Sequence, residues 1–145
     1  MTSIQDTFKD FLREMVAPRL RQSGLNGSGQ NYSLESESYW ALIGIQKSAH
    51  SNSESLKFTI NVFVVAKKEW EAARNERSYF PPKPTANVSW PIGWSQRIGY
   101  FLPANSDYWW AIDASTNLEH LSQQIIEAVC SKAVPIIQEK IKAEI

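Results

Sequence analysis

The chain has 145 residues, which suits one domain with a core of its own. Hydrophobic residues make up 43% of it and charged residues 21%, a balance typical of a globular protein and not of a disordered one. The formal net charge is +0, so no overall field attracts nucleic acid or an anionic membrane. The single cysteine, Cys130, cannot form an internal disulfide, and no apolar run resembles a signal peptide or a membrane span. We therefore expect one cytoplasmic domain over residues 1–145.

The first segment predicts an amphipathic helix. Ser3 is a suitable N-cap, and Asp6 follows in the first turn, near the positive end of the helix dipole. Pro18 should kink the helix because it removes a backbone donor. Gly24 should end it, with Leu25 folding back onto the last turn. The apolar residues at helical spacing are Ile4, Phe8, Phe11, Leu12, Met15, Val16 and Leu20.

Three strands follow a break at 27–29, where glycines flank a serine. The stretch 30–34 alternates between polar and apolar residues, and 39–48 begins with a near-continuous apolar run that favours a central position. A polar loop at 49–55 leads to 56–65, whose strict alternation is the clearest strand pattern in the chain.

A proline-rich insert occupies about 67–93. It begins with a short predicted helix at 67–76, and its second half contains four prolines, which favour a loop with extended pieces. We expect a second hairpin after it, with strands at 94–102 and 108–113 joined by a turn at 103–106.

The last segment predicts a long helix. Thr116 and Glu119 fit a capping box, and Pro135 should kink the helix further along. Its apolar stripe consists of Leu118, Leu121, Ile125, Val129, Ala133, Ile137 and Ile141. The predicted fold is α+β, with a single antiparallel sheet of about five strands in the order α-β-β-β-insert-β-β-α. Both long helices should pack on one face of the sheet, because each has one apolar stripe to bury, which leaves the other face partly open.

Short motifs in this order resemble a family of bacterial proteins known as domain of unknown function 4304. They are Gln46-Lys47-Ser48, Phe58-Thr59-Ile60-Asn61, Trp94 with Arg97-Ile98-Gly99, and Asp107 with Trp109-Trp110. Together with the outer helices, the resemblance covers nearly the whole chain except the insert. It supports the fold and implies no activity.

A polar group on the strands is the first candidate site. A loop centred near Asn52 would place Ile45 opposite Thr59, with Lys47, Thr59 and Asn61 on the face away from the helices. These residues form either a polar binding patch or an ordinary solvent-facing surface in which Asn61 ties down the insert.

A group of tryptophans is the second candidate. Trp90, Trp94, Trp109 and Trp110 are close in sequence, and such side chains serve either as interface anchors or as core. Trp109 and Trp110 are adjacent on a strand, so they should point to opposite faces. In the second hairpin Arg97 would lie opposite Asp113, as a surface ion pair or as an anchor for an anionic group.

Two classes of function remain open. The first is a non-enzymatic module that binds another protein, as a monomer or weak homodimer, through the insert and the second hairpin. The second is a small enzyme or small-ligand binder that uses Lys47, Asn61 and Arg97 on the open face. His50 and His120 are isolated in sequence, so we expect no metal site, no cofactor and no catalytic residues.

Overall fold

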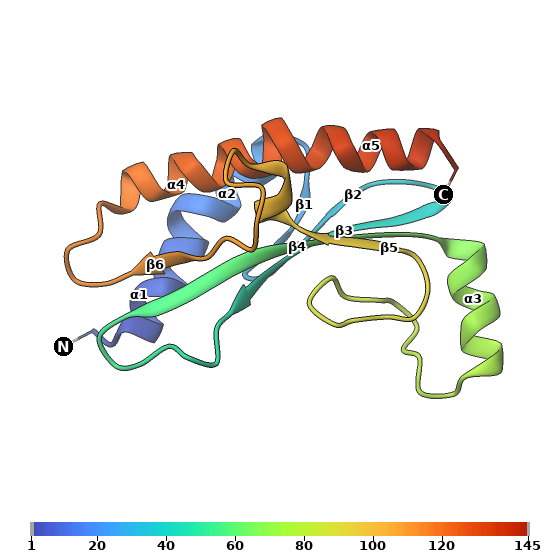
Figure 1. The fold of residues 1–145 in the computed structure, drawn as a ribbon, viewed down its shortest axis with the longest axis horizontal. Coiled ribbons are helices and arrows are strands. Elements are labelled where there is room, and N and C mark those ends of the chain that lie inside the picture. The colour runs from blue at the N-terminus through green and yellow to red at the C-terminus, as the bar shows by residue number, and fades with distance from the viewer. Residues whose placement is uncertain (1, 145) are drawn as a thin grey trace.

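The computed structural model describes residues 2–144 and shows an open antiparallel sheet with long helices along one face (Figure 1). The α+β prediction is therefore confirmed. The strands pair in the order β1-β2-β3-β4-β5, and β6 also pairs with β4. The strands are β1 (Asn26–Ser28), β2 (Asn31–Leu34), β3 (Tyr39–Lys47), β4 (Leu56–Ala66), β5 (Trp94–Arg97) and β6 (Trp110–Ile112).

Strand β1 is a sixth strand that the sequence pattern did not indicate. It pairs with β2 across a two-residue turn, in which Gly29 adopts a φ of 59°. Such turns need left-handed backbone, which Gly29 supplies, so the segment interpreted as a chain break instead forms the end of β1 and the turn of a hairpin.

Each long helix contains one wider turn directly before its proline. The π-helical turns precede Pro18 and Pro135. In a regular α-helix a proline ring would clash with the carbonyl group of the preceding turn, and the proline nitrogen donates no hydrogen bond. The predicted irregularities are thus located at the expected positions. The segments are α1 (Ile4–Phe11), π-helix Leu12–Val16 and α2 (Ala17–Gln22), then α4 (Leu118–Glu127), π-helix Ala128–Ala133 and α5 (Val134–Lys142).

The ends of the first helix form as predicted. The Asp6 backbone N–H donates to the Ser3 hydroxyl at 3.1 Å. At the other end Gly24 has a φ of 102°, and the Leu25 N–H donates to the Leu20 carbonyl, as in a Schellman motif. The last helix differs from the prediction, because its N-cap is Asn117 and not Thr116.

The main core lies between the long helices and one face of the sheet, so the prediction that both helices share a face is confirmed (Figure 1). Phe58 is fully buried there between Phe8 of α1 and Trp110 of β6, at ring-centroid distances of 5.2 and 5.8 Å. The sheet contributes Ile43, Ile45, Phe58, Ile60, Val62 and Val64, and the last helix contributes Leu121, Ile125, Val129, Ala133 and Ile137.

The register of β3 and β4 is one residue away from the predicted one. Ile45 lies opposite Ile60, and Gly44 lies opposite Asn61. Residues opposite each other point to the same face, so this register puts the apolar residues that fill the main core on one face of both strands. The predicted register would have set Ile45 against Thr59.

The predicted second hairpin does not form. Strands β5 and β6 lie one after the other along the same edge of β4 and pair with it, not with each other. A 3-10 helix at Ile98–Phe101 turns the chain between them. Arg97 therefore does not face Asp113, whose carboxylate instead accepts hydrogen bonds from Ser115 and Thr116.

The insert builds a small second core on the other face of the sheet. Its helix α3 (Lys67–Glu76) brings in Trp70, which is fully buried and stacks on Phe80 at 4.8 Å. Trp70 and Phe80 pack with Leu42, Phe63 and Val65, which project from the sheet. The face expected to be partly open is thus covered at this end. Among the helices of residues 2–144, none is both long and apolar enough to span a membrane.

Candidate functional site

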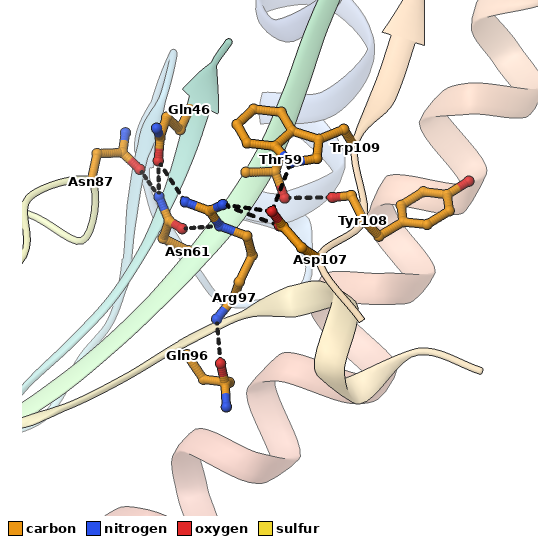
Figure 2. A network of polar contacts seen from close by, with 9 residues as sticks. All are labelled: Gln46, Thr59, Asn61, Asn87, Gln96, Arg97, Asp107, Tyr108 and Trp109. Carbon is orange, nitrogen blue, oxygen red and sulfur yellow. Dashed lines mark hydrogen bonds and ion pairs between the residues drawn. The ribbon is translucent and has the colours of Figure 1, made fainter. Parts of the chain in front are cut away.

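A connected polar network occupies the sheet face that the long helices leave uncovered (Figure 2). At its centre Asn61 of β4 accepts a hydrogen bond from Arg97 Nε at 3.2 Å. The Asn61 amide nitrogen donates to the side-chain oxygens of Gln46 and Asn87, at 2.7 and 2.9 Å. Asn87 in turn donates to the backbone carbonyl of Ile45 at 3.0 Å.

The direction of these bonds is fixed by chemistry. Arg97 can only donate, so the oxygen of the Asn61 amide must face it. The nitrogen of Asn61 must then face Gln46 and Asn87, and the chain ends at the Ile45 carbonyl, which can only accept. Such a network has a single satisfied arrangement, which makes it a rigid feature of the sheet surface.

Gly44 provides the space for Asn87. A Cβ atom at Gly44 would collide with the Asn87 carboxamide. Gly44 and Asn61 are directly opposite across β3 and β4, so the missing side chain opens a place for an insert residue on the sheet. The insert is thereby fastened to the strands through a hydrogen-bonded amide.

Arg97 is held from the other side by Asp107 and Trp109. Its Nη1 lies 3.1 and 3.2 Å from the two Asp107 oxygens, and its guanidinium lies 5.1 Å from the centre of the Trp109 ring. Desolvation raises the pKa of the Asp107 carboxyl, but hydrogen bonds from Trp109 and Arg97 and the charge of Arg97 outweigh it, so the pKa is lowered. Asp107 is therefore ionised at neutral pH. Since it is about half exposed, the ion pair itself adds about 1 kcal/mol or less to stability.

The loop carrying Asp107 is placed by Gly99. A Cβ at Gly99 would collide with the Ser106 carbonyl and the backbone of Tyr108, so only a glycine permits this close approach. The Tyr108 carbonyl also accepts a hydrogen bond from the buried Thr59 hydroxyl at 2.7 Å. These contacts set the position of the carboxylate beside Arg97.

The network lines a cleft of about 460 Å³ between the insert loop and β5. This volume lies within the range of small-ligand sites, roughly 300–1,000 Å³. The titratable side chains lining the cleft are Arg97, Tyr100 and Asp107. Within residues 2–144, no group of His, Cys, Asp and Glu side chains is arranged to hold a metal ion.

Lys47 does not belong to this face. It lies opposite Phe58, on the helix side of the sheet, and its Nζ is 3.3 Å from the Gln5 side-chain oxygen. The expectation that Lys47 and Asn61 share a face is wrong because the true register shifts β3 by one residue. Its neighbour Gln46 takes that place.

The four tryptophans are divided among three places. Trp90 belongs to the insert core, where its N–H donates to the Thr85 carbonyl at 2.9 Å. Trp94 and Trp110 pack on the helix side, whereas Trp109 lies beside Arg97 on the opposite face. The expectation that adjacent Trp109 and Trp110 point to opposite faces is thus confirmed. None of the four is among the exposed side chains, so they form no surface patch of indoles.

Gln46, Asn87, Gln96 and Asp107 are network members that the sequence analysis did not select. A signal existed for two of them. Gln46, Asn61, Arg97 and Asp107 all fall within the motifs on which the family resemblance rests. Asn87 has no such signal, because the insert carries no motif.

Fold and cleft together define a small α+β domain with an amide-rich polar recess on the sheet face opposite its long helices. Residues 16–139 match the model of the family described as Domain of unknown function (DUF4304), and the chain belongs to that family. No curated protein and no solved structure matches the chain. The family is described without an activity, so a functional proposal has to rest on the chemistry of the cleft.

Proposed function

We propose that the protein is a non-enzymatic binding module that recognises amide groups of a partner protein in this cleft. The supporting observation is the ordered network around Arg97 and Asn61, which holds neighbouring polar groups toward the recess. A bacterial origin, a cytoplasmic location and a monomeric or weakly dimeric state belong to the same proposal.

Several polar groups of the cleft have donors to spare. Within residues 2–144, the side-chain nitrogens of Gln46 and Gln96 donate no hydrogen bond, whereas the side-chain oxygens of both residues accept one in the network. Arg97 Nη2 makes one long contact, 3.4 Å, to Gln46. Asp107 offers the opposite property, a carboxylate acceptor. A carboxamide or main-chain amide, which accepts through its oxygen and donates through its nitrogen, complements both.

The balance of charge favours a neutral ligand group. Arg97 and Asp107 are the cation and the anion that line the cleft, and they pair with each other. A ligand carboxylate would approach Asp107 as well as Arg97, and the two like charges would repel. An amide avoids that cost.

The rim of the cleft supports a protein partner. Val88 and Tyr100 line it and are 48% and 46% exposed, unusually high fractions for large apolar side chains of this protein. Apolar and tyrosine side chains around a half-buried arginine are typical of protein interfaces. Catalysis has less support, since Asp107 has a lowered pKa and is therefore a weak base.

Site-specific photo-crosslinking tests the proposal. A photoreactive side chain replaces Ser89, an exposed residue of the cleft, and the protein is irradiated in cells of its host. Ser78, an exposed insert residue outside the cleft, is the matched control position. We expect a discrete adduct with one protein from position 89 that disappears in the Arg97→Lys background. An equal adduct from position 78, an adduct indifferent to Arg97→Lys, or no adduct would contradict the proposal.

A further inference from the structure

Strand β5 forms part of an outer edge of the sheet. It lies at the end of the strand order and pairs with β4 alone. In an antiparallel strand the backbone groups of successive residues point alternately to one side and to the other. Every second residue of β5 therefore directs its N–H and C=O groups away from β4.

The hydrogen bonds of the neighbouring strands identify these outward residues. The N–H of Ile45 in β3 donates to the carbonyl of Gln30 at 2.8 Å, on the β2 side. Its neighbour Gly44 therefore points to β4, where it forms a hydrogen-bonded pair with Asn61. The backbone groups of Asn61 are thus directed to β3, and those of its β5 partner, Arg97, are directed outward.

The hydrogen bond of the Arg97 N–H has this outward direction. It donates to the side-chain oxygen of its neighbour Gln96 at 3.0 Å. Ser95, two residues earlier, is oriented in the same way as Arg97. Within residues 2–144, the outward N–H and carbonyl of Ser95 and the carbonyl of Arg97 form no hydrogen bond. A side-chain amide thus occupies one position at which the carbonyl of an added strand would lie.

This edge of the sheet is accessible. Ser95 is exposed, and Ser95, Gln96 and Arg97 all line the polar cleft, so open space lies beside them. The opposite edge of the sheet differs, because the Gly27 carbonyl of β1 accepts a hydrogen bond from Arg21 at 3.0 Å. Unpaired edge groups are a template for another strand, and proteins commonly cover those that have no partner.

We propose that an extended segment of the partner protein adds to β5 as a further antiparallel strand, the orientation of all strand pairs in this sheet. This inference rests on the proposed function and names the form in which the partner's amides arrive. An extended main chain presents N–H and C=O groups at the same two-residue spacing as Ser95 and Arg97 do. The partner residue that pairs with Arg97 has its side chain on the same face as Arg97, so this side chain enters the polar cleft.

A second copy of this chain fits the edge less well than a peptide segment does. Pairing of β5 with the same strand of another copy would bring two Arg97 side chains to one face of a short ladder. Like charges repel there, because cross-strand neighbours are close. An uncharged segment avoids this repulsion.

NMR titration with the blocked peptide acetyl-Val-Gln-Val-Thr-Val-methylamide tests the inference. Its glutamine can pair with Arg97 while its threonine pairs with Ser95. Methylating the backbone nitrogens of the glutamine and the threonine removes the two donors that face β5, whereas methylating those of the third and fifth residues removes donors that face away. We expect the first methylated peptide to bind at least about tenfold more weakly than the unmethylated one, and the second to bind about as tightly.

A pair of variants at Ser95 tests the same edge from the protein side. Ser95→Pro removes the outward N–H without removing a hydrogen bond to β4, and edge strands tolerate proline in this orientation. Ser95→Ala, which keeps the N–H, is the matched control. Ser95→Pro should weaken binding of the unmethylated peptide at least about fivefold, and Ser95→Ala should leave it unchanged. Thermal unfolding checks the fold of both variants, and the methylated peptides test the parent protein even where Ser95→Pro is destabilised.

Equal affinity of the two methylated peptides, or amide shifts that do not include 94–97, would overturn strand addition. A stable dimer in sedimentation that the peptide does not dissociate would assign the edge to a second copy and overturn it as well. The absence of saturable binding would contradict both this inference and the proposed function.

The two proposals can also fail separately. If methylation has no effect while Gln46, Asn61 and Asn87 still shift, strand addition is wrong and the amide-binding cleft stands. A peptide with valine in place of glutamine tests the cleft. If it binds as tightly as the parent peptide and remains sensitive to methylation, the amide preference of the cleft is wrong and strand addition stands.

Discussion

Replacing Asn61 by alanine removes the central member of the polar network. Asn61 makes two hydrogen bonds to neutral side chains and one to a guanidinium. A hydrogen bond between neutral groups contributes a net of about 1 kcal/mol to stability, and a hydrogen bond to a charged group about 2 kcal/mol. Asn61 is half-buried, so water can replace part of the hydrogen bonds that the substitution removes. We expect Asn61→Ala to lower the free energy of unfolding by about 2–3 kcal/mol. Urea denaturation measures this, with an unchanged slope showing that the same surface unfolds.

Asn31→Ala is the matched control. Asn31 lies exposed on β2, and its side chain has no hydrogen-bond partner among residues 2–144, so its loss should stay within about 0.5 kcal/mol. Combining Asn61→Ala with Asn87→Ala should show a coupling of about 1 kcal/mol, because the two side chains share a bond. The network would be refuted if Asn61→Ala lowered the free energy of unfolding no more than Asn31→Ala does. It would also be refuted if the effects of Asn61→Ala and Asn87→Ala were strictly additive.

Three further predictions follow from the packing. Gly44→Ala should lower the free energy of unfolding by about 1–2 kcal/mol by displacing the Asn87 carboxamide, and should increase amide hydrogen exchange in the insert. An equal loss of stability in an Asn87→Ala background would show that the collision is not the cause. In denaturant titrations Phe58→Ala should lower the free energy of unfolding by about 3–5 kcal/mol and Lys57→Ala by less than about 0.5 kcal/mol, because Phe58 is buried and Lys57 is exposed. Similar losses would mean that Phe58 does not point into the core. Burial raises the pKa of Tyr32 to about 12, and its hydroxyl has no partner within residues 2–144, so Tyr32→Phe should stabilise the protein at neutral pH by about 1 kcal/mol. Because that pKa is raised on folding, the parent protein should lose stability relative to Tyr32→Phe as the pH rises from about 10 to about 12; parallel pH curves would contradict this reasoning.

The elements that sequence could predict are those with long regular patterns. Both outer helices and the strands at 39–47 and 56–66 follow from periodicity, and the caps at Ser3 and Gly24 follow from local chemistry. These features depend on residues close in sequence. The register between the two central strands does not, and it was wrong by one residue.

The loop between those strands explains the error. The Asn52 side chain accepts hydrogen bonds from the backbone of Glu54 and Ser55, and the Asn52 N–H donates to the Ser55 carbonyl. The tight turn therefore spans 52–55 and is not centred on Asn52. That shift moved Lys47 to the helix side and brought Gln46 into the site. A one-residue slip reverses the face of every side chain on a strand.

The rest of the site depends on contacts between distant segments. Arg97 and Asn61 could be selected as polar strand residues, but Asn87 reaches them only because Gly44 leaves room for an insert loop. Asp107 reaches Arg97 because the chain turns at Gly99 and does not continue as a hairpin strand. Neither arrangement follows from local propensity.

The most direct test of the proposed binding cleft is an NMR titration with a blocked glutamine, N-acetyl-glutamine methylamide. The comparison is between Arg97→Lys and Arg74→Lys, since Arg74 is a similarly half-buried, ion-paired arginine located on α3. We predict saturable shifts at Gln46, Asn61 and Asn87 in the parent protein and in Arg74→Lys, and an affinity at least about fivefold weaker in Arg97→Lys. Equal binding by both variants, or no saturable shift at these three residues, would contradict the assignment of this cleft as the binding site.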